Sequence, residues 1–360
     1  MRIFAILFVI ATHLFMQADW ATHWSNNSSW QFTTYRTFLT TFSGNFGNFL
    51  FCTIGCYFLV SKHYNFQKLK SVVLRVWRPT FFYSASTFLF GLIIGLYGLS
   101  LPGVLQGFLP FISGNYWYVN DWIILILMSP ILYSMFNALS RKQFAYLIIL
   151  TISIALICAW PFGYNAKINN TRSLISGFIL VYAVTFFYKK FGMPLRSRWL
   201  FLLGLMQPVG LLLSYALKAQ NVKIEILTFS WDKVAQTEWD LTGIFFADLF
   251  SITTAVCFFI CIDRLRGFRT RPIGKLGICV NIAASTCFSV YLIHMSRFLT
   301  PWLWQHIVQA QQFEDTLLGY FYPWMCIFAI FTTCAVIDLI RQVLVFRAKQ
   351  IYAKYEALKR

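Results

Sequence analysis

Charged residues are scarce in this sequence, and their scarcity excludes an ordinary soluble domain. Only 12% of the 360 residues are Asp, Glu, Lys or Arg, whereas soluble domains have about 25%. Hydrophobic residues make up 58% of the chain, and long apolar runs recur from one end to the other. A run of about 20 apolar residues is the length that an α-helix needs to cross a bilayer. The sequence therefore predicts an all-α integral membrane protein.

Patterns typical of metal or disulfide sites are also missing. The nine cysteines include no Cys-x-x-Cys pair, and no His or Cys spacing matches a zinc site. Cys52 and Cys56 lie four residues apart, as do Cys257 and Cys261. We interpret these pairs as small apolar residues on helix-packing faces. We therefore expect no metal and no permanently bound cofactor.

Acidic residues are the rarer charged class. The chain has 12 Asp and Glu against 30 Lys and Arg, which gives a net charge of +18. Such a surplus can serve nucleic-acid binding, but the positive residues here fall in short clusters between the apolar runs. No stripe of Arg and Lys with interleaved aromatics appears outside those runs. The distribution follows the positive-inside rule of membrane topology and excludes nucleic acid as a partner.

Ten apolar stretches are long enough to be membrane-spanning helices. They cover, approximately, residues 2–18, 43–61, 79–99, 117–138, 143–160, 173–188, 199–217, 241–262, 278–304 and 317–340. Most Lys and Arg residues then fall on one side, so the positive-inside rule places both termini in the cytoplasm. Pro79 is expected to open the third helix and Pro130 to kink the fourth. Residues 1–340 form one transmembrane domain, and residues 341–360 form a basic cytoplasmic tail helix.

The first stretch carries two ionisable side chains on one face. Arg2 and His13 are eleven residues apart, which in a helix is a rise of about 16 Å and a rotation of about 20°. Ionisable groups inside a membrane are costly and mark functional sites, so His13 is the first candidate for chemistry. Arg2 has no cytoplasmic lead-in, which indicates a truncated or mis-assigned start.

Four further side chains are candidates, each with an ordinary alternative. Arg75 and Arg78 share a helical face, and their planar guanidinium forks suit phosphate; the alternative is positive-inside charge. His294 lies within the ninth stretch and is either a site residue or a hydrogen-bonded packing residue. Asp248, in the eighth stretch, either partners a histidine or caps a polar patch.

Two loops on the predicted outer side have a composition that suits sugar recognition. Residues 19–42 are rich in Trp, Asn, Ser and Thr, and residues 218–240 carry four carboxylates. Aromatic faces can stack on the C–H groups of a sugar while the polar groups bond its hydroxyls. The alternative is the aromatic belt that membrane proteins place at the bilayer interface.

The order of these features resembles acyltransferase family 3, the bacterial integral-membrane O-acyltransferases of surface polysaccharides. The motifs that carry the resemblance are Arg2 with His13, Arg75 and Arg78 before Pro79, Tyr116-Trp117-Tyr118 with Ser129-Pro130, and Tyr291-Leu292-Ile293-His294. They occur in the family's order and cover essentially the whole chain. Two positions depart from the pattern: Gly55-Cys56 replaces the usual Ser-Gly, and Asn115 stands where a histidine sometimes precedes the fourth-helix tryptophan.

The resemblance implies an enzyme of the bacterial inner membrane. It would move an acyl group, most commonly acetyl, from cytoplasmic acyl-CoA to a hydroxyl of an envelope polysaccharide or lipid-linked glycan. Arg2, Arg75 and Arg78 would hold the phosphates of CoA. His13 would act as a general base or as an acyl carrier. The supporting residues would be Trp117, Tyr291, His294 and Asp248.

The rival hypothesis is a membrane protein that is not an enzyme. A transporter or flippase of a glycan or lipid-linked sugar would share the helices, the outer aromatics and the buried histidines. It would need no arginine clamp aligned with a deep imidazole. The pairing of Arg2 with His13 on one helical face therefore favours the acyltransferase.

Overall fold

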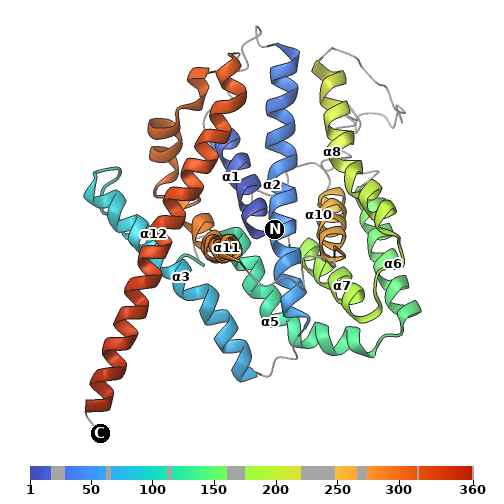
Figure 1. Cartoon of the computed structure of the whole chain (residues 1–360), viewed down its shortest axis with the longest axis horizontal. Coiled ribbons are helices and arrows are strands. Elements are labelled where there is room, and N and C mark those ends of the chain that lie inside the picture. The colour runs from blue at the N-terminus through green and yellow to red at the C-terminus, as the bar shows by residue number, and fades with distance from the viewer. Residues whose placement is uncertain are drawn as a thin grey trace.

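The computed structural model describes residues 1–17, 29–61, 66–111, 116–159, 175–219, 248–265, 274–313 and 316–358. Within these ranges every regular element is a helix, as predicted (Figure 1). The elements are α1 (Arg2–Gln17), α2 (Trp30–Leu59), α3 (Phe66–Ile93), α4 (Leu101–Phe108), α5 (Trp117–Ala138), α6 (Arg141–Ala159), α7 (Ile175–Phe191), α8 (Ser197–Ala219), α10 (Asp248–Asp263), α11 (Lys275–His294), η2 (Trp302–Val308), η3 (Ala310–Phe313) and α12 (Leu317–Leu358).

Several of these helices meet the requirements for crossing a membrane. In the described part of the chain, four are long and apolar enough: Trp117–Ala138, Ser197–Ala216, Lys275–His294 and Leu317–Arg347. A helix also stands at each of the ten predicted stretches. The count of ten spans and the cytoplasmic side of both termini remain predictions.

Helix α3 begins earlier than predicted, so Pro79 lies inside it and does not open it. The segment before Pro79 has apolar residues at helical spacing, with Leu69 buried and Val72, Val73 and Val76 packed against the core. This pattern extends the helix toward its N-terminus. The hydroxyl of the next residue, Thr80, donates to the Val76 carbonyl at 2.8 Å. Pro130 lies inside α5, as predicted.

The ninth predicted helix, residues 278–304, is not continuous, and that prediction is wrong. α11 ends at His294, and the chain turns before the π-helix η2 begins at Trp302. The turn is fixed from outside the segment, because the hydroxyls of Ser296 and Thr87 lie 2.7 Å apart. Arg297, which follows the bonded Ser296, is exposed. The break places His294 at a helix end and brings η2 back toward the bundle.

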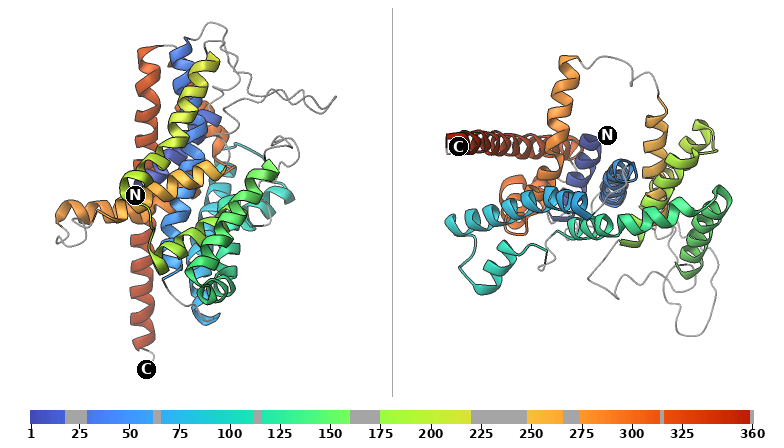
Figure 2. Two further views of the ribbon diagram at one scale, coloured as in Figure 1. Left: turned by 90° about the vertical axis from the view of Figure 1, so that its right-hand side faces the viewer. Right: turned by 90° about the horizontal axis from the view of Figure 1, so that it is seen from below.

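Helix α1 lies inside the bundle and packs against α2, α11 and α12 (Figures 1 and 2). Its contact with α2 is the most extensive, and two glycines allow it. A Cβ atom added at Gly47 would lie 2.8 Å from the Ala5 carbonyl oxygen, and one at Gly44 would lie 2.7 Å from the Thr12 side chain. The Thr12 and Ser43 hydroxyls also bond across this interface at 2.6 Å.

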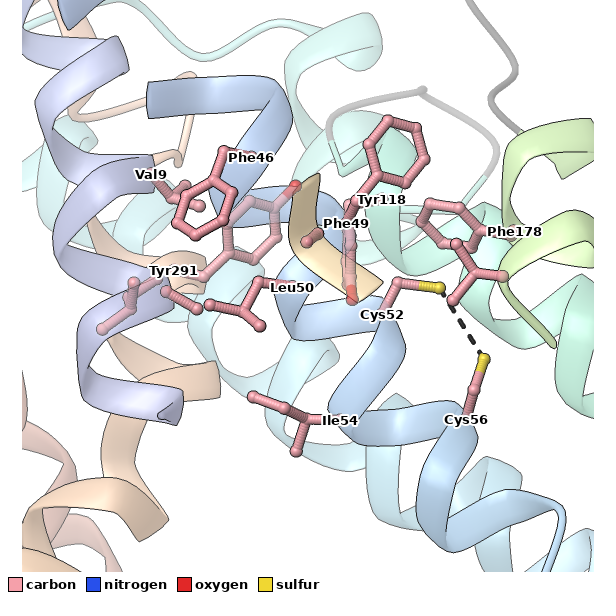
Figure 3. Close-up of a cluster of buried hydrophobic side chains, with 14 of the residues drawn as sticks. Val9, Phe46, Phe49, Leu50, Cys52, Ile54, Cys56, Tyr118, Phe178 and Tyr291 are labelled. Atoms are coloured by element: carbon pink, nitrogen blue, oxygen red, sulfur yellow. Dashed lines mark hydrogen bonds between the residues drawn. The ribbon is translucent and has the colours of Figure 1, made fainter. Parts of the chain in front are cut away.

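Aromatic side chains fill the space between α2, α5, α7 and α11 (Figure 3). Tyr118 on α5 meets Phe178 on α7 edge-on, with ring centroids 5.1 Å apart. Cys52 and Cys56 on α2 are buried free thiols whose sulfur atoms lie 3.8 Å apart. Such edge-on aromatic contacts stabilise a core beyond the area that they bury. Through Tyr291, α11 belongs to the same buried cluster as α2.

Candidate functional site

Two histidines far apart in the sequence meet inside the bundle. His13 Nδ1 on α1 lies 2.9 Å from His294 Nε2 on α11. The second nitrogen of His294, Nδ1, lies 2.6 Å from the Val290 carbonyl oxygen, one turn earlier on the same helix. His294 is fully buried, and His13 is half-buried. We call His13 and His294 the histidine dyad.

Hydrogen-bond chemistry assigns the protons of the neutral dyad. A carbonyl oxygen only accepts, so His294 Nδ1 carries the proton that it donates to Val290. His294 Nε2 then has a lone pair, and it accepts a hydrogen bond from the Nδ1–H of His13. This leaves the lone pair of His13 on Nε2, which is the tautomer that a general base or nucleophile needs. When His13 Nε2 takes a proton, the bond to His294 remains and stabilises the imidazolium.

The aromatic motif at the start of α5 forms a wall of this site. Tyr116 is buried and donates its hydroxyl to the Leu292 carbonyl at 3.0 Å. Tyr118 packs edge-on against Tyr291, with ring centroids 5.8 Å apart. The structure thus brings two separate sequence motifs together. Trp117, the predicted supporting residue in the Tyr116-Trp117-Tyr118 motif, contacts Tyr118 and packs at the edge of the core.

A small apolar cavity lies beside α1 at the level of Ile6 and Val9. It is lined by Ile6, Val9, Asn48, Phe51, Tyr118, Phe288 and Tyr291. Ile6 and Val9 lie between Arg2 and His13 on the same helical face. The opposite wall comes from α11, where Tyr291 is one turn before His294. We call this cavity the passage.

Arg2 lies one helical turn before Ile6, which lines the passage. The Arg2 guanidinium lies 5.8 Å from the centre of the Phe58 ring on α2, a cation–π distance. The buried Cys287 lies on α11, the helix against which α1 packs. Cys287, Tyr291 and His294 are spaced by four and three residues, so they share one face of α11. Arg2 and the dyad therefore mark the two ends of one α1–α11 interface.

Three predicted site residues are not brought to the dyad. Arg75 and Arg78 are exposed on α3, and Arg75 Nε donates to the Ser71 carbonyl at 3.3 Å. Among the described residues, no hydrogen bond, ion pair or ring contact joins either arginine to Arg2. Asp248 is half-buried at the start of α10. His13 Nδ1 has His294 as its hydrogen-bond partner, and the role of Asp248 stays a prediction.

Sequence reasoning missed a buried ionic cluster between α3 and α12. Asp338 is fully buried and accepts from the Tyr83 hydroxyl at 2.7 Å and from Arg341 Nε at 2.8 Å. Gln342 donates to its other oxygen at 2.7 Å. A carboxylate in an apolar helix with an arginine three residues later was a usable signal. Asn115, residues 19–28 and residues 220–240 lie outside the described residues.

The model of the acyltransferase 3 family, described as an acyltransferase domain, matches residues 1–341. The chain belongs to acyltransferase family 3. As a member of acyltransferase family 3, it is a membrane acyltransferase. No curated protein matches the chain, and no solved structure matches it. Membership confirms the resemblance drawn from the four motifs, and the roles of the individual residues rest on the geometry above.

Proposed function

We propose that this acyltransferase moves an acyl group, most commonly acetyl, from cytoplasmic acyl-CoA to a hydroxyl of a cell-envelope polysaccharide or lipid-linked glycan. The bacterial inner membrane is the compartment in which these two substrates face each other across one bilayer. The observation that carries the proposal is the histidine dyad, in which His13 Nδ1 lies 2.9 Å from His294 Nε2. His13 shares one face of α1 with Arg2, and the passage lined by Ile6, Val9 and Tyr291 lies beside that face.

The donor side of the proposal rests on shape and charge. Acyl-CoA has an anionic nucleotide head and a long, thin pantetheine arm. Arg2 offers a guanidinium to the phosphates at the start of α1. The arm follows the apolar wall of Ile6 and Val9, and the rise of about 16 Å from Arg2 to His13 is of the order of its length. The exposed Arg75 and Arg78 offer further donors to the nucleotide.

The chemistry follows from the proton positions. His13 Nε2 takes the proton of the acceptor hydroxyl while the oxygen attacks the thioester carbonyl carbon. The tetrahedral intermediate collapses, the carbon–sulfur bond breaks, and the CoA thiolate leaves with the proton returned by His13. The products are the O-acyl glycan and CoA thiol. His294 Nε2 accepts the hydrogen bond from His13 Nδ1–H, which holds the His13 ring in the required tautomer and stabilises its cation.

The decisive experiment compares His13→Ala with His306→Ala. His306 is an exposed histidine on η2 and serves as the matched control. Both variants are assayed in lipid vesicles with acetyl-CoA labelled in the acetyl group, and the envelope glycan of cells that make them is analysed for O-acyl groups. We expect His13→Ala to lose about 10²–10⁴-fold in rate and His306→Ala to keep it. Retained glycan acylation by inserted His13→Ala would refute the proposal.

A further inference from the structure

Trp304 carries a hydrogen-bond donor that the fold leaves unused. Its side chain is fully buried, and its Nε1–H has no acceptor among the described residues. A buried donor without a partner is destabilising, and in native structures such groups are few and call for an explanation. A catalytic role is one such explanation.

The position of Trp304 connects this donor to the histidine dyad. Its ring lies 6.5 Å from the His294 ring, with the two planes 86° apart. The element that carries it, η2, also contacts α1. η2 is a π-helix, a rare conformation that occurs frequently at functional sites. Its end is fixed by the left-handed residue Gln309, whose N–H bonds the Trp304 carbonyl at 3.2 Å.

Two of the hydroxyls near the dyad already bond protein groups. Tyr116 donates to the Leu292 carbonyl, and Ser296 is paired with Thr87. Tyr291 is different, because its buried hydroxyl has no partner among the described residues. Tyr291 lines the passage, however, and so belongs to the route of the donor. Trp304 is thus a second buried donor beside His294 that lacks a protein acceptor among the described residues, and unlike Tyr291 it does not line the passage.

We infer that Trp304 Nε1–H donates a hydrogen bond to the thioester carbonyl oxygen of the donor during acyl transfer. The inference rests on the proposed function. When the acceptor oxygen attacks the carbonyl carbon, the C=O electron pair moves onto oxygen, and that oxyanion must be stabilised without water. When the carbon–sulfur bond breaks, the pair returns. A prepositioned donor in a dry site stabilises the transition state more than the ground state.

The test removes the N–H and keeps the ring. Trp304→Phe and replacement of Trp304 by 3-benzothienylalanine, which has sulfur in place of N–H, are measured in vesicles with acetyl-CoA. We expect kcat to fall about 100-fold, with the KM for acetyl-CoA changed less than about 3-fold. The control is Trp324→Phe, because Trp324 Nε1 already donates to the Tyr35 hydroxyl at 2.9 Å. This control should keep kcat within about 3-fold.

Each outcome separates the inference from the proposed function. If the benzothienyl variant keeps the kcat of the natural chain while His13→Ala is inactive, the oxyanion role of Trp304 is wrong and the base role of His13 stands. If His13→Ala is active, the proposed function fails first. A fall in kcat confined to Trp304→Phe, with full activity of the benzothienyl variant, assigns Trp304 to ring packing and overturns the inference.

Discussion

The contact between Gly47 and α1 predicts how sensitive the dyad is to a single methyl group. In Gly47→Ala the new Cβ would lie 2.8 Å from the Ala5 carbonyl oxygen and 3.1 Å from the Val9 backbone nitrogen, where ordinary contact begins at 3.4 Å. Backbone atoms cannot rotate away, so α1 must move by about 0.6 Å. That displacement would stretch the 2.9 Å bond between the histidines to about the limit for a hydrogen bond.

The expected fall in kcat follows from how enzyme rates respond when catalytic groups are displaced. A shift of about 1 Å can lower a rate about 100-fold, so we expect Gly47→Ala to lower kcat about 10-fold. Overpacking should also destabilise the protein by about 1–3 kcal/mol. Gly44→Ala should be milder, because its Cβ meets the Thr12 side chain, which can rotate away at the loss of one hydrogen bond to Ser43, worth about 1 kcal/mol.

The assay is acyl transfer in vesicles together with a thermal unfolding curve in detergent for each variant. Gly98→Ala is the control, because a Cβ at Gly98 meets no atom within 4 Å. Full turnover by Gly47→Ala would show that the α1–α2 contact does not set the position of the dyad. Equal losses for Gly98→Ala would show that the assay reports something other than this contact.

Three further outcomes follow from the described geometry. His294→Gln keeps an acceptor at the dyad and should retain more kcat than His294→Leu, which we expect to lose about 100-fold; equal rates would exclude a positioning role. Arg75→Ala combined with Arg78→Ala should raise the KM for acyl-CoA about 10-fold, because two exposed contacts of up to about 1 kcal/mol each are lost. An unchanged KM would contradict the proposal that these arginines bind the nucleotide of acyl-CoA. Reporter fusions at Lys142 and Lys275 should read cytoplasmic, and an outer location of either would break the ten-span topology.

Local periodicity explains what the sequence could predict. The shared face of Arg2 and His13 depends on eleven residues of one helix, so helix geometry alone places it. The all-helical class follows in the same way, from apolar runs and few charges. The family could be identified because its four motifs appear in order along the chain, and the family match confirms that identification.

Contacts between distant segments explain what the sequence could not predict. His13 and His294 are 281 positions apart, and no local pattern says which helix α11 will meet. The sequence does not predict the end of α11 at His294 for a similar reason. The apolar run continues past it, and the helix stops where Ser296 bonds to Thr87 on α3. The sequence predicts Trp304 only as part of a membrane-spanning helix, because the lack of an acceptor for its Nε1–H depends on the folded structure.

The order of synthesis gives the dyad one more consequence. α1 is made before α11, which begins more than 270 residues after the start of α1. A nascent chain therefore carries His13 in the membrane for most of translation without the nitrogen that fixes its tautomer. Its reactive imidazole gains a defined proton arrangement only after α11 has inserted beside α1. An incomplete or misassembled chain would thus lack the dyad, and acyl transfer itself would report that α1 and α11 have come together.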